Sequence, residues 1–304
     1  MMPKITFAAF RREVLALYAP PMRRPATLAK MVQALDEFAP YCTLVADLKP
    51  ETIARWIRDH ASRRPASLDS HLRSLRAACN YAVKQGYLRS SPFEFRSPRQ
   101  WLDWDVPELP PPVHSAEEIA RVLRQADAEA GSAGWQAARL RAVIYTAAYT
   151  GARKLEILGL RLADVNLDQG ILEIRTNRRR PLKTPSSAAR LPIAPALAKV
   201  LVDWIPLAGP EWLYPGVRRA GPWFEGAAGA KPLDQLKALG LRAGVPALTF
   251  QSLRHTFASL AEGWGIGELA LQRLLRHTRI RTQRSYRHPL EAVLRDVAAK
   301  VHFP

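Results

Sequence analysis

Cysteine is scarce in this chain, whose 304 residues include only Cys42 and Cys79. The two lie far apart in the sequence and form no CxxC motif, which argues against a disulfide framework and against a cysteine-ligated metal site. We therefore expect both to be buried, reduced thiols.

Long apolar segments are also missing. The longest uncharged apolar run, residues 142–152, is too short to cross a bilayer as a helix. The first residues, MMPKITFAAFRREV, lack the apolar core and the cleavage site of a signal peptide. These absences predict a cytoplasmic protein with no membrane contact.

Acidic residues are few compared with basic ones. The chain has 27 Asp and Glu against 45 Lys and Arg, a formal net charge of +18 at pH 7, while its 48% hydrophobic residues fit a folded, globular protein. A positive excess of this size concentrates and steers polyanions. We therefore expect nucleic acid as the partner.

Prolines cluster in the stretch RSPRQWLDWDVPELPPPVH, which ends at residue 114. Such a run favours extended polyproline geometry and makes a semi-rigid spacer. Because the length suggests two domains, we predict a first domain over 1–106, a linker over 107–114 and a second domain over 115–304.

The first domain is predicted to be helical, with apolar residues at helical spacing in 67–86 and Gly86 as a stop signal. Arg73 and Arg76 share another face of this helix, one turn apart. They either reach a groove of DNA or form an ordinary solvated face, and the sequence leaves both open. Earlier helices are expected at 5–18, 26–38 and 50–60.

The second domain is predicted to begin with helices. Ser115 and Glu118 form a capping box that opens the first of them. A long helix is expected over 135–149, and helices return from residue 233 onward. Helical spacing also continues through three leucines, Leu155, Leu158 and Leu162.

Between these helices, ILEIRT (171–176) and AARLPI (188–193) are predicted strands. The segment that joins them is basic, as expected for a solvated hairpin tip or for a contact with DNA. Its basic residues are Arg178, Arg179, Arg180 and Lys183. The expected fold class is therefore mainly α with a small antiparallel β-sheet.

Near the C-terminal end, six arginines and no acid occur from Arg273 to Arg287, around the single Tyr286. Like charges one turn apart repel each other. Such a run needs an anionic partner, and it gives the tyrosine a positive surround.

Several motifs follow one another in order: YTGARKLEILGLRLADV (149–165), the basic hairpin, FQSLRHTFASL (250–260), LLRHTRIRT (274–282) and then Tyr286. In motifs and order this half resembles the catalytic domain of the tyrosine recombinases, the phage integrase family. The helical first half resembles, more loosely, the SAM-like core-binding domain of that family. The resemblance implies a DNA-binding first domain and a mixed α/β catalytic second domain.

The resemblance assigns the phosphate-binding residues. Arg153, in the pattern T-G-x-R-x-x-E, and Arg254, in L-R-H, would grip the non-bridging phosphate oxygens with their planar guanidinium groups. Glu156 and His255 would support these two arginines structurally.

It also assigns the groups that break the DNA strand. Tyr286 would attack the phosphorus and form a 3′-phosphotyrosine, which stores the bond energy, so that neither a metal nor a cofactor is needed. Lys183, the one lysine between Lys154 and Lys199, would protonate the leaving 5′-oxygen. His277 would donate a hydrogen bond to the phosphate.

Two positions depart from the family pattern. Arg276 replaces the glycine before His277, and Gln251 stands where the family has a histidine. A glutamine can donate a hydrogen bond to a phosphate oxygen but cannot carry a proton at pH 7. Either the enzyme is active with Gln251 in an organising role, or the chain binds DNA with reduced or lost cleavage.

The segment after Tyr286 is predicted to form a helix with one apolar face. This helix packs either on its own domain or, as the resemblance suggests, on a neighbouring subunit in a tetramer that holds two double-stranded DNA sites. Accessory DNA-bending factors and a place at the nucleoid fit the same resemblance. The apolar face comprises Leu290, Val293, Leu294, Val297, Ala298 and Val301.

The function implied by the resemblance is site-specific DNA recombination. A nicking enzyme of the type IB topoisomerase kind and a non-enzymatic DNA-binding protein are the alternatives. The target DNA sequence, the element served and the direction of the reaction do not follow from these patterns.

Overall fold

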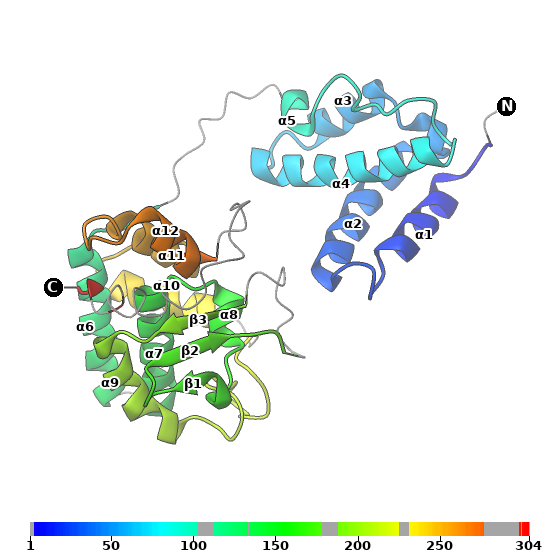
Figure 1. Cartoon of the computed structure of the whole chain (residues 1–304). Helices are drawn as coiled ribbons and strands as arrows, with labels where there is room; N and C mark the ends of the chain where they lie inside the picture. Colours follow the sequence, from blue (N-terminus) through cyan, green and yellow to red (C-terminus); the bar gives the residue numbers. More distant parts are fainter. Residues whose placement is uncertain are drawn as a thin grey trace. The chain divides into compact units, whose positions relative to one another are not determined.

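The computed structural model describes residues 3–102, 112–132, 134–177, 188–224, 231–276, 298 and 300–303. The chain divides into two compact units, residues 1–109 and 110–304 (Figure 1). Across the described residues, no helix has both the length and the apolar character needed to cross a membrane.

The first unit is helical, as predicted, with α1 (Phe7–Tyr18), α2 (Pro25–Phe38), α3 (Pro50–Asp59), α4 (Pro65–Lys84) and α5 (Pro98–Trp101). Each of α2 to α5 begins with proline, which fits the first helical turn because an N–H there would have no helical partner. Gly86, with a φ of +72°, follows the end of α4 in the left-handed conformation expected of a helix stop.

Aromatic and aliphatic side chains fill the core of this unit. Phe38 stacks on Trp56 with the ring centroids 4.7 Å apart, and both side chains are fully buried. Cys42 and Cys79 are buried free thiols, as predicted, and burial raises the pKa of Cys42 to about 12. The apolar face of α4 supplies much of the core, through Leu68, Leu72, Leu75, Cys79 and Ala82.

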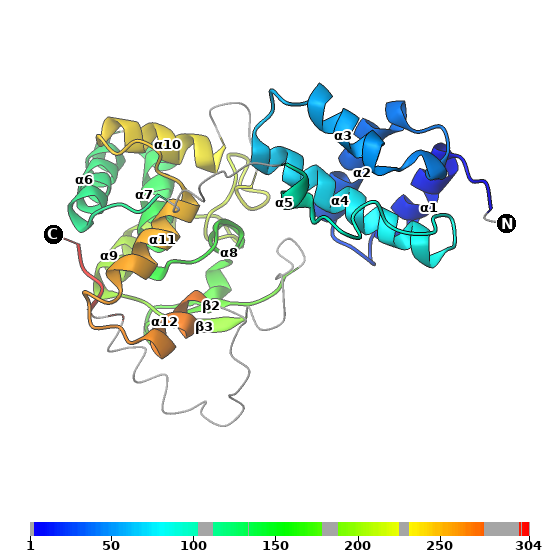
Figure 2. The ribbon, with the colours of Figure 1, turned by 90° about the horizontal axis from the view of Figure 1, so that it is seen from above.

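The second unit is built around helix α7 (Gly134–Thr150), which contacts α6 (Ala116–Ser132), α8 (Lys154–Leu158), α9 (Pro195–Trp204), α10 (Pro232–Arg242) and α11 (Phe250–Leu260). Figure 2 shows α6 and α10 alongside it. Because its neighbours cover α7 on several sides, residues 142–150 are all buried. This explains why the longest apolar run of the sequence lies there.

The capping box predicted at the start of α6 is present. The backbone N–H of Ser115 donates to Glu118 Oε2 at 2.8 Å, and the N–H of Glu118 donates to Ser115 Oγ at 3.1 Å. These bonds satisfy two donors that the first helical turn leaves open.

Three short antiparallel strands pair in the order β1 (Val165–Asn166), β2 (Ile171–Ile174) and β3 (Ala189–Pro192). In the central strand, Leu172 pairs with Val165 on one side and Leu191 on the other. The two longer strands confirm the predicted hairpin strands. β1 was not predicted, because two residues are too few to show an alternating pattern. The fold is mainly α with a small antiparallel sheet, as expected.

The prediction that helical spacing continues through Leu155, Leu158 and Leu162 is wrong. α8 ends at Leu158, which is fully buried, and Gly159 follows it. Leu162 opens a separate 3₁₀ turn that Asp164 ends. Leu155 is 59% exposed, so the three leucines do not share one buried face.

The last described residues of the chain pack on their own unit. Ala298 and Val301, from the face of the predicted C-terminal helix, are both buried. The ring of Phe303 meets those of Tyr149 and Trp264 edge-on, with centroids 5.2 and 5.5 Å away. This end of the chain therefore contributes to the core of the second unit.

Candidate active site around Glu156

The first predicted motif lies at the C-terminal end of α7. The chain leaves this helix at Gly151, whose φ is +56°. A Cβ atom at this position would lie 2.8 Å from Cδ1 of Phe257 on α11 and 3.0 Å from Cδ2 of Leu275, the last residue of α12 (Glu268–Leu275). Glycine is required both by this conformation and by the close approach of the two helices.

Arg153 and Glu156 form a pair at the start of α8. Arg153 is the N-cap residue of this helix, and its backbone N–H donates to Glu156 Oε2 at 2.8 Å while Nη1 donates to Oε1 at 2.9 Å. The Glu156 side chain is 6% exposed and that of Arg153 is 39% exposed. The guanidinium is thus anchored to a buried carboxylate and remains open to solvent on another side.

Arg254 reaches the same place from α11. Its Nη1 donates to the carbonyl oxygen of Gly151 at 2.6 Å, and its Nη2 donates to the carbonyl oxygen of Leu275. These carbonyls lie at the C-terminal ends of α7 and α12, where open C=O groups and the helix dipole favour a cation. A guanidinium has more N–H donors than these two bonds use, so Arg254 can also bind a ligand.

Arg276 adds a third guanidinium to the cluster. It is the C-cap residue of α12, with a φ of 56°, and its side chain is 1% exposed. Its Nη2 donates to Glu156 Oε2 at 2.5 Å, and its Nη1 donates to the carbonyl oxygen of Leu274 at 2.6 Å. Glu156 is therefore shared between Arg276 and Arg153.

The charges of this cluster influence one another. Burial, together with the positive charges of Arg153 and Arg276, lowers the pKa of Arg254 to about 10. Burial by itself would raise the pKa of Glu156, but Arg276 and Arg153 outweigh it and hold that pKa below its ordinary value. Both groups therefore stay charged at neutral pH, and the cluster as a whole is positive and suited to an anion.

Helix α11 carries two further predicted residues. Gln251 is exposed, and its Nε2 lies 3.3 Å from Nε2 of His255, which must accept because an amide nitrogen only donates. On the buried side of the same helix, the ring nitrogen Nε2 of His114 lies 3.0 Å from Ser252 Oγ. The backbone N–H of His114 donates to Thr256 Oγ1 at 2.9 Å. His114 thus holds α11 from behind, while Gln251 faces outward.

The structure therefore brings together Arg153, Glu156 and Arg254, with Gln251 and His255 on the same helix as Arg254. No group of three or more His, Cys, Asp or Glu side chains that could hold a metal ion occurs within the described part of the chain. The other predicted residues of the second unit lie outside the described residues: Arg178, Arg179, Arg180, Lys183, His277 and Tyr286.

In the first unit, the predicted DNA-binding residues lie on the exposed side of α4. The Arg73 side chain is 67% exposed and pairs with Asp69 at 2.8 Å, and Arg76 is exposed as well. A surface pair of this kind contributes little to stability. Their contact with DNA stays a prediction.

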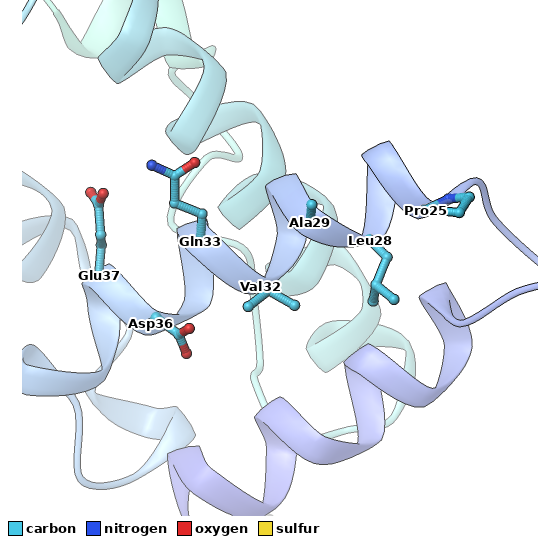
Figure 3. Close-up of a pocket in the computed structure, with 7 residues that line it drawn as sticks. All are labelled: Pro25, Leu28, Ala29, Val32, Gln33, Asp36 and Glu37. Atoms are coloured by element: carbon cyan, nitrogen blue, oxygen red, sulfur yellow. The ribbon is translucent and has the colours of Figure 1, made fainter. Parts of the chain in front are cut away.

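The first unit also has a shallow cavity of about 690 Å³ along α2. Leu28, Val32 and Asp36 point from α2 toward α1 in Figure 3. Asp36 accepts a hydrogen bond from Arg11 Nε at 2.6 Å, which offsets its charge. The cavity is mainly apolar and differs in this from the charged cluster around Glu156.

Two residues of the site were not predicted from the sequence. Arg276 was recognised only as a replacement for glycine, although a charged residue at a helix stop, directly before a motif histidine, was a usable signal. His114 gave no signal, because a single histidine has no periodicity and its partner Ser252 lies 138 residues further along.

The fold and the site define a class of protein: a mainly α unit with a small antiparallel sheet, which presents clustered arginines to an anion. Residues 114–292, more than half of the chain, match the model of the phage integrase family. The chain belongs to the phage integrase family, whose enzymes are site-specific tyrosine recombinases.

Individual relatives agree with this assignment. The chain is 30% identical to tyrosine recombinase XerD of Brucella suis biovar 1 (strain 1330) over 250 residues, 78% of this chain and 76% of that protein. Its structure is similar to that of a lambda integrase dimer bound to a COC' core site, with a TM-score of 0.67, 17% identity and coverage of 93% and 99% of the two chains. The Tn1549 transposon integrase in complex with a circular intermediate DNA gives a TM-score of 0.69 at 16% identity, with 92% of each chain covered. At such low identities these structures establish the fold.

Proposed function

We propose that this chain is a site-specific DNA recombinase that cuts and rejoins DNA strands through a 3′-phosphotyrosine at Tyr286. The observation that carries the proposal is that Arg153 and Arg254, from two separate motifs, belong to one charged cluster around Glu156. Two planar guanidinium groups in one place match the non-bridging oxygens of a single phosphodiester.

In the proposed cleavage step, the phenol of Tyr286 loses its proton to water and the phenolate attacks the phosphorus. The new O–P bond forms as the bond to the 5′-oxygen breaks, and Lys183 gives that oxygen a proton. Arg153 and Arg254 stabilise the charge on the non-bridging oxygens, each by about 3–4 kcal/mol, as is usual for a pre-placed donor. His277 adds a hydrogen bond to the phosphate.

Resealing is the reverse of this step on a new partner. The 5′-hydroxyl of another strand attacks the phosphotyrosine, its proton returns to Lys183, and Tyr286 leaves. The energy of the cleaved DNA bond is kept in the bond between Tyr286 and the 3′-phosphate, so that the free-energy change of the strand exchange is close to zero. No metal or cofactor is assigned a role in this proposal.

Double-stranded DNA is the proposed substrate. The second unit would bind it through the Glu156 cluster and the basic hairpin around Arg178, Arg179 and Arg180, and the first unit, as a core-binding domain, through Arg73 and Arg76 on α4. The net charge of +18 supports this assignment, because contacts to phosphates supply most of the affinity for DNA. A place in the cytoplasm at the nucleoid would follow from such a substrate.

A tetramer on two DNA sites is the proposed assembly. It is supported by the similarity to a lambda integrase tetramer bound to a Holliday junction, which has a TM-score of 0.67. In this assembly the segment after Tyr286 would dock on a neighbouring subunit through residues that precede Ala298, because Ala298 and Val301 are buried on their own unit. Accessory DNA-bending factors would help to bring the two sites together.

Gln251 favours a second candidate function, that of a DNA-binding protein with reduced or lost cleavage. Its amide is exposed beside His255 on α11 but cannot carry a proton. Recombination is the better supported of the two, because Arg153, Glu156 and Arg254 keep an arrangement that DNA binding alone would not need.

The experiment that tests the proposal uses the full chain and a nicked suicide substrate taken from the DNA that flanks its gene. We expect a covalent protein–DNA adduct with the wild type and with Tyr41→Phe, a control in the first unit, and none with Tyr286→Phe. Products that join two duplexes would identify recombination, and nicked products alone would identify the topoisomerase-like alternative. DNA binding without any adduct would support the second candidate.

A further inference from the structure

We propose that Arg276 is a positioning residue of this site, whose guanidinium holds the Glu156 carboxylate so that it orients Arg153. This inference rests on the proposed function, since it concerns how a phosphate-binding arginine is held in place. The family pattern has a glycine at this position, and the inference gives a role to the arginine that replaces it.

The backbone at this position does not favour arginine. Arg276 has a φ of 56° and a ψ of 46°, and its N–H donates to the Arg273 carbonyl at the end of α12. In this left-handed conformation a side chain is disfavoured, and glycine is the usual residue at such a helix end. The interactions of the side chain must therefore offset the preference of the backbone.

These interactions converge on Glu156. One carboxylate oxygen, Oε2, accepts from Arg276 Nη2 at 2.5 Å and from the Arg153 backbone N–H at 2.8 Å. The other oxygen, Oε1, accepts from Arg153 Nη1 at 2.9 Å. Arg276 thus fixes the carboxylate from one side, and the remaining oxygen is presented to the Arg153 guanidinium in a defined direction.

The charge of Arg276 acts in the same sense. Glu156 alone would cancel part of the positive charge that Arg153 and Arg254 offer to a phosphate. Arg276 compensates for Glu156, so that the cluster keeps the full charge of the two phosphate-binding arginines. With a side chain that is 1% exposed, Arg276 has no access to DNA itself and acts through Glu156.

A buried ion pair between α12 and α8 could also serve stability alone. In that case, removing Arg276 would lower only the melting temperature. If Arg276 is a positioning residue, its removal also changes the geometry of Arg153 and the pH dependence of the cleavage rate.

The test compares the full-length wild type with Arg276→Gly, Glu156→Gln and the double variant Arg276→Gly/Glu156→Gln. Arg276→Gly is expected to fold, because glycine suits the left-handed backbone, and to form the covalent adduct between about ten and a hundred times more slowly at saturating DNA, as is usual for a misplaced catalytic group. Arg121→Ala is the matched control. It removes an arginine of α6 that pairs with Glu118 at 4.0 Å, outside the cluster, and should leave the adduct rate nearly unchanged.

The pH dependence separates positioning from a role in stability alone. Removing Arg276 takes away one of the positive charges that lower the pKa of Glu156, so that this pKa rises relative to the wild type, while Arg153 and Arg254 remain as the charges that face it from α8 and α11. The ratio of the wild-type rate to the Arg276→Gly rate should therefore grow as the pH falls from 8 toward the ordinary Glu value of 4.5, and groups common to both proteins cancel in this ratio. The double variant, which has no carboxylate to protonate, should show no such growth. A flat ratio, or an Arg276→Gly rate equal to that of Arg121→Ala, would overturn the proposal.

A readout that needs no chemistry keeps this inference distinct from the proposed function. In ¹⁵N-arginine NMR spectra at low temperature, the Nη–H signals of Arg153, assigned with Arg153→Lys, should be protected from exchange in the wild type, because Nη1 donates to Glu156 Oε1, and should lose this protection in Arg276→Gly. If the wild type forms no adduct, the proposed function fails, and these signals still decide the role of Arg276. Arg153 signals that are identical in both proteins would show that Arg276 does not position Arg153.

Discussion

Arg254 Nη1 donates to the carbonyl oxygen of Gly151 at 2.6 Å, across 103 residues of sequence. This bond joins the glycine of one family motif to the arginine of another. The second bond of Arg254, to Leu275, adds the C-terminal end of α12. The arginine is therefore seated on two helix ends, and its position depends on how closely those ends approach α11.

Gly151→Ala should displace the two carbonyl groups that hold Arg254. The new Cβ would lie 2.8 Å from Phe257 Cδ1 in a backbone with a φ of +56°. We expect a loss of about 1–3 kcal/mol in the free energy of unfolding, since overpacking and left-handed strain add, and a slower cleavage step. Urea denaturation and the adduct assay measure the two effects.

Gly170→Ala is the matched control for this prediction. Gly170 has a φ of +64°, but no atom other than those of Gly170 and its two chain neighbours lies within 4 Å of the Cβ position. This variant should show only the backbone strain, about 1 kcal/mol, and normal cleavage. Equal losses in the two variants would mean that the close approach at Gly151 has no importance of its own.

Sequence patterns predicted those parts of the fold that depend on local spacing. The apolar face of α4 around Leu72 and the capping box of Ser115 were predictable, because each follows from residues a few positions apart. The same reasoning failed for Leu155, Leu158 and Leu162, because α8 ends at Leu158 and the side chain of Leu155 is 59% exposed. Spacing alone does not reveal that a helix stops after Leu158.

The candidate site was predictable where motifs carry it. Arg153, Glu156 and Arg254 were named from their motifs, and the structure places them in one cluster. Arg276 carried one usable signal, a charged residue at a helix stop, but its ion pair with Glu156 could not be predicted, because that carboxylate is 120 residues away. His114 could not be predicted either, because its partner Ser252 is 138 residues away. Pairings over such distances are set by the packed fold and leave no trace in local composition.

Gln251→His should leave the affinity for DNA nearly unchanged and should preserve or raise the rate of cleavage. The side chain is exposed on α11 beside His255, so a histidine has room there and adds a group that can carry a proton. Filter binding gives the affinity, and the suicide substrate gives the rate. A sharp loss of cleavage in this variant would show that position 251 does not correspond to the family histidine.

Lys183→Ala should slow the cleavage of ordinary DNA but spare a substrate with a better 5′ leaving group. The proposed task of this lysine is to protonate the leaving oxygen, and a leaving group that departs without a proton does not need it. Single-turnover rates on the two substrates, each compared with the wild type, provide the measurement. Equal damage on both substrates would reject the role of Lys183 as general acid.

The stability of the second unit should depend on the protonation of His114. Burial lowers the pKa of this histidine from its ordinary value of 6.5, and the charge of Glu118, 3.8 Å away, opposes the shift only in part. The unfolded chain therefore takes up the proton first, and stability is lost as the pH falls through and below 6.5.

His114→Gln keeps an amide that can pair with Ser252 but has no proton to gain. The wild type should thus lose unfolding free energy relative to His114→Gln between pH 8 and pH 5, as measured by urea denaturation of both full-length chains. A difference that stays constant over this range would mean that the buried imidazole is not the group that titrates, and that its bonds to α11 do not depend on its remaining neutral.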